Sequence, residues 1–308
     1  MNISDIIIIG AGTAGLTAGI YAARAKKQTL IIEKNAPGGQ ILETLKVENY
    51  PGIDSISGAD FGKTLKSQVE KFGGKILTAE VLSVSREDAV TFRVETDEGP
   101  YFAKSLIFAN GSRERRLDVP GEENYIGRGV SYCATCDGAL YKDKTVAVYG
   151  GGNTAAYSVL YLAEIAKKVY WCFRKSASRA ESELVEKIKH QPNVEILSET
   201  EIIELCGEGK LEEVVTSSVQ IAERVSTPLV FKTDALFVSI GREPDNEIAR
   251  NLVNLDADGF IDSDETCTTS EKGVFVAGDA RRKPLNQLVT SAADGAVAAS
   301  AAIKFLNQ

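Results

Sequence analysis

The sequence contains the same local pattern twice: a short apolar segment, a glycine-rich turn and an alanine-rich amphipathic segment. In the first copy the run Ile6–Ile9 leads into Gly10-Ala11-Gly12-Thr13-Ala14-Gly15, and the following residues predict a helix over Leu16–Lys26 and a strand over Thr29–Ile32. A run of β-branched residues is typical of a strand buried on both faces. The change to helical periodicity completes a strand–helix–strand unit.

The second copy predicts a strand over Thr145–Tyr149, the turn Gly150-Gly151-Gly152, a helix over Ala156–Ala166 and a strand over Val169–Phe173. Two such units in 308 residues predict an α/β chain with two nucleotide-binding folds. No long Pro/Ser-rich linker separates them, so we expect short crossings between the domains near residues 111–116 and 241–244. Further strands are expected over residues 229–240 and 274–277, and a closing helix over 287–306.

The first glycine turn has the spacing of a dinucleotide site. The first glycine allows the tight turn, the second lets the backbone approach a pyrophosphate, and the third lets helix and strand pack closely. Glu33 ends the second strand, where a carboxylate binds a ribose hydroxyl and repels a 2′-phosphate, so FAD or NAD is favoured over NADP. The candidate cofactor-binding residues in this region are Gly10, Gly12, Thr13, Ala14, Gly15, Glu33 and Lys34.

The second glycine turn is followed by a basic loop instead of a carboxylate. Guanidinium and ammonium groups at this place suit a 2′-phosphate, which favours NADPH. The alternative is an ordinary basic surface loop. The candidate residues for this second nucleotide are Gly150, Gly152, Asn153, Thr154, Arg174, Lys175 and Arg179.

The chain has five cysteines, and two of them form the motif Cys133-Ala134-Thr135-Cys136-Asp137. Such a pair supports a reversible disulfide and can lower the pKa of one thiol, while the neighbouring Asp137 can move a proton. Zinc usually requires four Cys or His ligands, and the chain has one histidine and no second Cys-x-x-Cys motif, so we expect no metal site. We interpret Cys172 as a packed core thiol and Cys206 and Cys267 as inert.

Charge and hydropathy exclude two classes of partner. The net charge of −8 argues against nonspecific nucleic-acid binding. No apolar run approaches the roughly 18–20 residues that cross a bilayer, so we expect a cytoplasmic protein without a membrane segment. Two local basic runs are either solvated loop charge or docking patches for an acidic partner. They are Arg113 with Arg115 and Arg116, and Arg281 with Arg282 and Lys283.

Two further segments of the first domain combine glycines with amides. Gly38-Gly39-Gln40 and Glu48-Asn49-Tyr50-Pro51-Gly52 allow close backbone approach to a flat ring, and the Gln and Asn amides can serve the donors and acceptors of an isoalloxazine edge. Either segment alone is equally compatible with an ordinary turn. Together they favour a flavin, and Gly39, Gln40 and Asn49 are the candidate contacts.

Taken together, these motifs resemble the low-molecular-weight thioredoxin reductases over essentially the whole chain, including the closing Gly273-Val274-Phe275-Val276-Ala277-Gly278-Asp279. The resemblance implies two Rossmann-like three-layer domains that bind FAD and NAD(P), the second inserted in the first. Residues 1–113 and 245–308 would bind FAD, and residues 114–244 would carry the redox pair. It also implies a homodimer, domain rotation and thioredoxin as partner. Its further candidate flavin contacts are Gly278, Asp279, Gln287 and Leu288, and the resemblance implies that Asp279 holds the ribityl chain of the flavin and Gln287 the ring edge.

The sequence departs from the family mainly on the side of the electron donor. The family's loop reads His-Arg-Arg-x-x-x-Arg, whereas this chain has Phe173-Arg174-Lys175-Ser176-Ala177-Ser178-Arg179. Two glutamates that usually follow the second glycine turn are Tyr157 and Ser158, and the usual Arg before Gln287 is Asn286. A minority of relatives use ferredoxin, an acidic protein that the run Arg281–Lys283 could attract.

Several hypotheses therefore stay open at the level of sequence. The leading one is a thioredoxin-disulfide reductase with NADPH slightly favoured as donor. The alternatives are a ferredoxin-dependent reductase with a degenerate NADPH site, a flavin reductase for another thiol carrier, and a flavin-containing redox sensor or scaffold.

Overall fold

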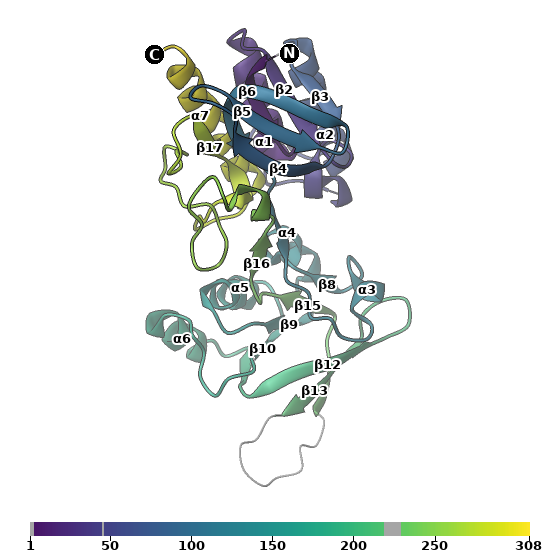
Figure 1. Cartoon of the computed structure of the whole chain (residues 1–308). Helices are drawn as coiled ribbons and strands as arrows, with labels where there is room; N and C mark the ends of the chain where they lie inside the picture. Colours follow the sequence, from purple (N-terminus) through teal and green to yellow (C-terminus); the bar gives the residue numbers. More distant parts are fainter. Residues whose placement is uncertain (1–2, 45, 219–228) are drawn as a thin grey trace. The chain divides into compact units, whose positions relative to one another are not determined.

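The computed structural model describes residues 3–44, 46–218 and 229–308, which divide into two compact units (Figure 1). The first unit contains the chain up to Arg113 together with Glu243–Gln308, and the second contains Glu114–Arg242. At the crossings, β7 (Ser112–Glu114) and β16 (Arg242–Pro244) pair as a two-stranded sheet. The second crossing lies between Arg242 and Glu243, inside β16 and within residues 241–244. The first unit therefore resumes two residues before residue 245, where the sequence analysis begins the FAD-binding segment.

The first unit is built on a seven-stranded sheet. Its order is β3-β2-β1-β6-β5-β4, and β17 pairs with the end of β6 that β5 leaves free. The pairs β1–β2, β2–β3, β1–β6 and β6–β17 are parallel, while β4, β5 and β6 form an antiparallel meander. The strands are β1 (Ile3–Ile9), β2 (Thr29–Glu33), β3 (Lys75–Thr78), β4 (Val81–Arg86), β5 (Phe92–Thr96), β6 (Gly99–Phe108) and β17 (Val274–Val276).

Both faces of this sheet are covered, which explains the unbroken apolar run at the start of the chain. Ile6 and Ile8 pack into a cluster with helices α1 (Thr13–Arg24), α2 (Gly58–Lys71) and α7 (Leu288–Leu306). Ile7 and Ile9 point to the opposite face and pack against residues of β4 and β5. Alternate side chains of a strand point to opposite faces, so a strand that is covered twice is apolar throughout.

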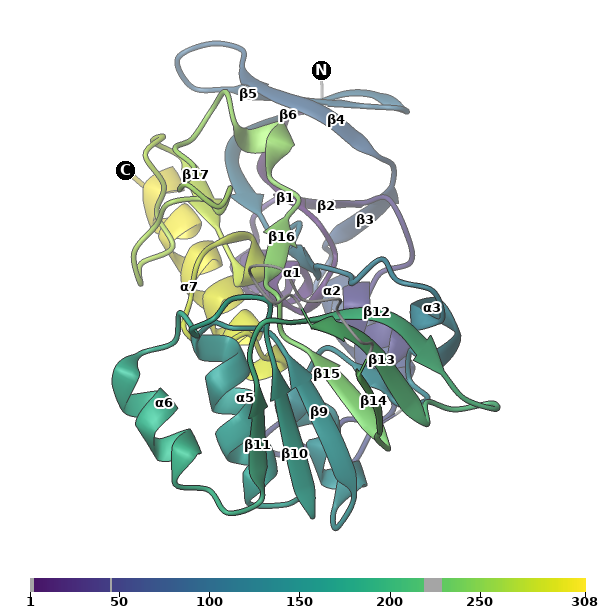
Figure 2. The same cartoon turned by 90° about the horizontal axis from the view of Figure 1, so that it is seen from below.

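The second unit repeats the three layers. Its five-stranded parallel sheet has the order β11-β10-β9-β15-β8. Figure 2 shows α5 (Asn153–Ala163) and α6 (Ser182–Lys189) on one side of it, and a three-stranded antiparallel sheet on the other. The strands of the two sheets are β8 (Val130–Ser131), β9 (Thr145–Tyr149), β10 (Lys168–Cys172), β11 (Val194–Leu197), β15 (Ala235–Val238), β12 (Thr200–Cys206), β13 (Glu213–Ser218) and β14 (Leu229–Lys232).

Both repeated units therefore have the predicted strands, but their helices begin earlier than the periodicity suggested. Helix α1 starts at Thr13 and α5 at Asn153, directly on the glycine turns, since Leu16 N–H donates to the Gly12 carbonyl (2.9 Å) and Ala156 N–H to the Gly152 carbonyl (3.1 Å). The starting residues predicted for both helices were wrong because the first helical turn contains few apolar residues, and the prediction relied on apolar periodicity. The free N–H groups of that turn are the ones that bind phosphate.

Helix α7 is the one helix of the described residues that is long and apolar enough to cross a membrane, with a mean hydropathy of 1.2. Its alanines make the average high without making a long apolar run. Ala298, Ala299 and Ala302 pack in the core of the first unit against α1, and Asp294 is buried in an ion pair. With 33% of its apolar window buried, one face of α7 belongs to the core of the first unit.

Candidate functional site

The first glycine turn is closed on one side and open on the other. Gly10 has φ +99°, and a Cβ there would lie 2.4 Å from the Ala109 carbonyl oxygen. A Cβ on Gly15 would lie 1.9 Å from the Gly10 carbonyl oxygen, so helix and strand leave no room for a side chain. A Cβ on Gly12 meets no atom within 4 Å. The turn thus presents free space at Gly12, next to the start of α1, where a pyrophosphate would bind.

This contrast predicts different effects of two similar substitutions. Gly15→Ala is expected to lower the unfolding temperature, because its methyl group overlaps the turn. Gly12→Ala is expected to leave the unfolding temperature of the flavin-free protein within about 2 °C and to reduce bound flavin at least about tenfold, because the methyl group fills ligand space. Thermal unfolding and the flavin absorbance of the purified proteins are the measurements. Wild-type flavin content in Gly12→Ala would contradict a pyrophosphate at this turn.

Glu33 is held against the same turn. Its Oε2 accepts a hydrogen bond from Ala11 N–H (2.7 Å) and its Oε1 from Asn35 N–H (2.9 Å). The carboxylate is therefore fixed at the carboxyl end of β2, the position for a ribose hydroxyl. Lys34 lies at the surface, with its ammonium group 3.4 Å from Asp245 Oδ2.

Two other glycine segments pack around this turn. Gly38 N–H donates to the Ala11 carbonyl (2.8 Å), and a Cβ on Gly39 would lie 3.0 Å from Gly12 Cα. Gly278 has φ +72°, and a Cβ there would lie 2.8 Å from the Cβ of Ala14. Residues predicted separately from three parts of the sequence thus meet within the first unit.

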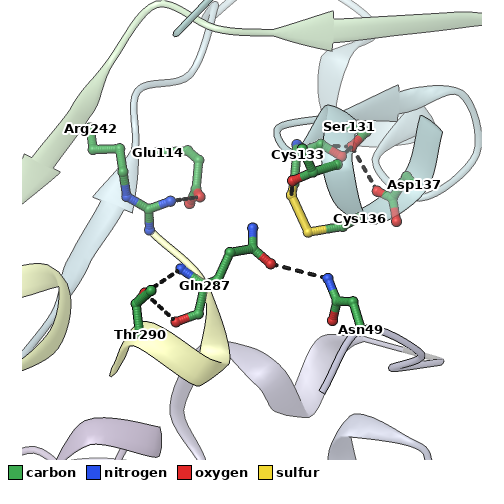
Figure 3. The surroundings of a disulfide bond; sticks show 10 residues. Asn49, Glu114, Ser131, Cys133, Cys136, Asp137, Arg242, Gln287 and Thr290 are labelled. Carbon is green, nitrogen blue, oxygen red and sulfur yellow. Dashed lines mark hydrogen bonds and ion pairs between the residues drawn. A yellow bond between two sulfur atoms is a disulfide. The ribbon is translucent and has the colours of Figure 1, made fainter. Parts of the chain in front are cut away.

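The predicted amides belong to the same unit. Asn49 Nδ2 donates to Gln287 Oε1 (3.1 Å), and Gln287 caps α7 through reciprocal bonds with Thr290 (Figure 3). Leu288 is the first residue of that helix, and the Gln40 amide donates to the Ser112 carbonyl. Asp279 Oδ1 accepts from Ser291 Oγ (3.4 Å). Gln287 and Asp279 are thereby placed at the start of α7.

Sequence reasoning missed Asn110 in this unit. It follows β6, beside Gly10, and its Oδ1 is a buried oxygen without a hydrogen-bond partner among the described residues. Its amide nitrogen is used, since it donates to the Asp245 carbonyl and to Asn246 Oδ1. A buried acceptor without a partner is unfavourable, so it is a candidate for binding a ligand donor. The available signal was the Asn-Gly pair that directly follows the apolar segment Leu106–Ala109, a segment that the sequence analysis did not predict as a strand.

In the second unit Cys133 and Cys136 form a disulfide, with their Cα atoms 5.3 Å apart (Figure 3). Cys133 precedes the short helix α4 (Ala134–Asp137), and its carbonyl accepts from the N–H groups of Cys136 (3.2 Å) and Asp137 (3.1 Å). Cys136 is exposed and Cys133 is half-buried. The local helical turn therefore brings the two sulfur atoms together and leaves the pair accessible.

A hydroxyl that the sequence did not single out connects Asp137 to this turn. Ser131 Oγ donates to Asp137 Oδ2 (2.7 Å) and accepts from Cys133 N–H (3.1 Å) (Figure 3). Next to it, Tyr132 is anchored by the buried Glu122, whose Oε1 accepts from the tyrosine hydroxyl (2.6 Å). Burial and the Glu122 carboxylate raise the pKa of Tyr132. The Cys-x-x-Cys segment is thus tied to its unit on one side while Asp137 stays next to the disulfide.

The other three cysteines are free thiols, as expected. Cys172 is fully buried in β10, and burial raises the pKa of its thiol to about 12. Burial, with the Asp294 carboxylate, raises the pKa of Cys267 to about 11. Cys206 is half-buried, and its pKa is also raised.

These pKa values predict a selective alkylation pattern. A thiol with a raised pKa stays protonated below that pKa, so at pH 8 the buried Cys172 side chain is a thiol and not the nucleophilic thiolate. After reduction of the native protein, iodoacetamide is expected to label Cys133 and Cys136 fastest and to leave Cys172 and Cys267 unlabelled. Peptide mass spectrometry gives the sites, and the protein unfolded in urea is the control. Equal labelling of Cys172 in the folded and unfolded protein would show that the thiol is accessible.

The second glycine turn is built like the first. Gly150 has φ +148°, a Cβ there would lie 2.1 Å from the Ser239 carbonyl oxygen, and its own carbonyl accepts from the Trp171 indole N–H (2.8 Å). A Cβ on Gly152 meets no atom within 4 Å. The basic loop folds onto this turn, since the Gly151 carbonyl accepts from Arg179 N–H (2.6 Å) and Ser178 Oγ (3.0 Å).

The side chains of this loop are available to a ligand. Arg174, Lys175 and Arg179 are exposed, and the carboxylate of Glu201 lies 4.0 Å from Arg174. Asn153 exchanges two hydrogen bonds with Glu181 (2.8 Å each), and Thr154 is exposed at the first turn of α5.

Three of the residues that depart from the family have different surroundings. Phe173 packs in the core on Trp171, with ring centroids 5.0 Å apart. Ser158 is buried and donates to the Thr154 carbonyl (2.9 Å), whereas Tyr157 is 57% exposed. Neither Phe173 nor Ser158 therefore replaces the charge of the usual family residue.

The sequence allows two interpretations of the basic run Arg281–Lys283, either solvated loop charge or a docking patch. The ion pairs of this run contradict both interpretations. The Arg281 and Lys283 side chains are only 4% and 3% exposed and pair with Asp294. Arg282 is exposed, but it pairs with Asp256 (2.7 Å) and Asp258 (2.5 Å). The run is neutralised by acidic residues that lie apart from it in the sequence. In the other run, Arg113 pairs with Glu243 (3.4 Å) and Arg116 with Glu123 (3.3 Å).

Comparison with known proteins agrees with this arrangement. Residues 4–296 match the family model of pyridine nucleotide-disulphide oxidoreductases. A thioredoxin reductase of Treponema pallidum is 38% identical over 98% of this chain and 97% of its own length. A 34.2 kDa protein in the rubredoxin operon of Clostridium pasteurianum is also 38% identical, with the same coverage. The crystal structure of thioredoxin reductase from Streptococcus pyogenes is 35% identical and superposes with a TM-score of 0.90, covering 99% of this chain and 98% of the other. The chain therefore belongs to the pyridine nucleotide-disulphide oxidoreductases and, within them, to the family of low-molecular-weight thioredoxin reductases.

Proposed function

We propose that this protein is an FAD-dependent thioredoxin-disulfide reductase. The observation that carries the proposal is a Cys133–Cys136 disulfide in a chain whose other unit brings Glu33 and the segments of Gly38–Gly39 and Gly278 to one glycine turn. A full-length relative named thioredoxin reductase adds support for the substrate. Electrons from the flavin would reduce this disulfide to a dithiol, and the disulfide of a thioredoxin would oxidise that dithiol again.

The first unit fits FAD by its own chemistry. The free space at Gly12 would receive the pyrophosphate, Glu33 a ribose and Asp279 the ribityl chain. The amides of Gln40, Asn49 and Gln287 would serve the ring edge, and the unpartnered Asn110 Oδ1 would accept from a cofactor donor. When bound, FAD supplies two-electron chemistry that can reduce a disulfide.

The cysteine pair then transfers the electrons as a dithiol. Two electrons break the S–S bond of Cys133–Cys136 and give two thiolates, one of which takes up a proton. The remaining thiolate attacks one sulfur of the thioredoxin disulfide, which forms a mixed disulfide and releases the other thioredoxin sulfur as a thiolate. The second thiol of the pair then loses its proton and attacks the mixed disulfide, which restores Cys133–Cys136 and releases the second thioredoxin thiolate. Asp137, held by Ser131, would give and take this proton.

We propose NADPH as the electron donor, ahead of reduced ferredoxin. The exposed Arg174, Lys175 and Arg179 suit a 2′-phosphate beside the second glycine turn. Reduced ferredoxin stays the second candidate donor because Phe173, Tyr157 and Ser158 replace residues that the family usually has on the side of the NADPH site. The proposed docking of ferredoxin on the run Arg281–Lys283 loses its basis, because those charges are already paired.

Stopped-flow measurement of flavin reduction separates the two donors. Mixing the oxidised protein anaerobically with NADPH, NADH or reduced ferredoxin is expected to give fast bleaching of the flavin absorbance with NADPH alone. Bleaching by ferredoxin and inertness to both nicotinamides would establish the second candidate instead. Steady-state reduction of thioredoxin by catalytic amounts of protein excludes a redox sensor or scaffold, and a panel of thiol carriers tests whether another carrier is preferred.

We further propose that the protein is a cytoplasmic homodimer. The dimer is supported by the family, and the compartment by three free thiols, which are typical of a reducing environment. Analytical ultracentrifugation of the holoprotein measures the oligomeric state.

A further inference from the structure

A cluster of buried charges lies next to Gly278 and Asp279, two of the candidate flavin contacts of the first unit. The guanidinium of Arg281 forms two hydrogen bonds with the carboxylate of Asp294, both 3.0 Å long. Asp294 Oδ2 also accepts from Gly278 N–H (3.0 Å) and lies 3.3 Å from the ammonium nitrogen of Lys283. The three side chains are only 3–10% exposed. One carboxylate on α7 thus holds two cations and the backbone just before Asp279.

Lys283 connects this cluster to Asp279. Its ammonium nitrogen lies 3.6 Å from Asp279 Oδ1 and 3.4 Å from Ser291 Oγ. Ser291 Oγ in turn donates to Asp279 Oδ1 (3.4 Å). Asp279 is 19% exposed and belongs to the short helix η4 (Gly278–Ala280), which begins at a glycine in the left-handed region. The orientation of this carboxylate therefore depends on Lys283 and Ser291, which approach it together.

Stability alone gives a poor account of such a cluster. Burying an ion pair costs about as much desolvation as its attraction returns, so replacing it with apolar residues is often neutral or favourable. Here two cations and two carboxylates lie around a single turn that carries a candidate cofactor residue. A carboxylate that must accept a hydrogen bond from a ligand hydroxyl gains from being held ionised and in one rotamer before the ligand arrives.

We propose that Lys283 is a positioning residue for FAD. Its ammonium group holds the Asp279 carboxylate in the orientation that accepts a hydroxyl of the ribityl chain, and Asp294 holds Lys283 in place. The inference rests on the proposed binding of FAD by the first unit. It assigns Lys283, the last residue of the basic run, an internal role that is separate from partner docking.

The test is the release of FAD from the diluted holoprotein, followed by the fluorescence of free FAD. Lys283→Met is expected to weaken FAD binding about tenfold, the effect of losing one charge-assisted hydrogen bond. Lys283→Arg keeps the charge and is expected to stay within about threefold of wild type. Arg282→Met removes an adjacent, exposed cation and is expected to change FAD binding less than twofold. If Lys283→Met alters the unfolding midpoint, Lys283→Gln takes its place.

A double-mutant cycle distinguishes positioning from general support of the fold. Because Lys283 acts through Asp279, Lys283→Met is expected to have no further effect in an Asp279→Asn background. Multiplicative effects of the two substitutions would overturn the proposal, as would wild-type FAD release from both Lys283→Met and Lys283→Gln. A wild-type protein that purifies without flavin and binds none would refute the proposed function itself, which is a different result.

Discussion

Cys136→Ser is expected to reduce the rate of thioredoxin-disulfide reduction about a thousandfold or more. The substitution removes one sulfur of the only disulfide among the described residues, so no two-electron acceptor remains between flavin and thioredoxin. Cys133→Ser is expected to cause a loss of the same size for the same reason. Both variants are expected to keep their flavin, because neither residue belongs to the unit with the candidate FAD contacts. Steady-state assays with oxidised thioredoxin and flavin absorbance are the measurements.

Cys206→Ser is the matched control for this experiment. It removes a free, half-buried thiol of the same unit and is expected to leave the rate unchanged within about twofold. Anaerobic titration of the wild type with dithionite is expected to consume two electrons for the flavin and two for the disulfide, and each Cys→Ser variant is expected to consume only the first two. Full thioredoxin reduction by Cys136→Ser would refute the proposed function.

Asp294→Ala is expected to destabilise the first unit by about 3–5 kcal/mol. The substitution leaves Arg281 and Lys283 buried without their shared carboxylate, and removing one partner of a buried ion pair is far more costly than losing an exposed pair. It also removes the acceptor of Gly278 N–H. Equilibrium urea unfolding followed by far-ultraviolet circular dichroism measures the loss.

Two comparisons make this result specific. Asp258→Ala removes an exposed partner of Arg282 and is expected to cost less than about 1 kcal/mol. Trp171, the single tryptophan, is fully buried in the second unit, so its fluorescence reports the unfolding of that unit. A loss below about 1 kcal/mol in Asp294→Ala would mean that water or other groups solvate Arg281 and Lys283.

The sequence by itself determined the parts of the fold that depend on neighbouring residues. The run Ile6–Ile9 and the segment Thr145–Tyr149 identified central strands, because a strand covered on both faces must be apolar at every position. The glycine spacing identified both turns, since a side chain at Gly10 or Gly150 collides with the backbone. The Cys-x-x-Cys spacing likewise identified the disulfide, which a single helical turn brings together.

Only the tertiary structure decided which charged and polar groups face inward. The sequence alone indicates surface cations at Arg281 and Lys283 because their partner Asp294 lies on a different element. Arg282 likewise pairs with Asp256 and Asp258, which lie on another loop. The bond from Ser131 to Asp137 and the unpartnered oxygen of Asn110 depend equally on distances and burial. Local periodicity records which face of an element is apolar, but the pairing of a charge depends on which distant carboxylate the fold brings within a few ångströms of it.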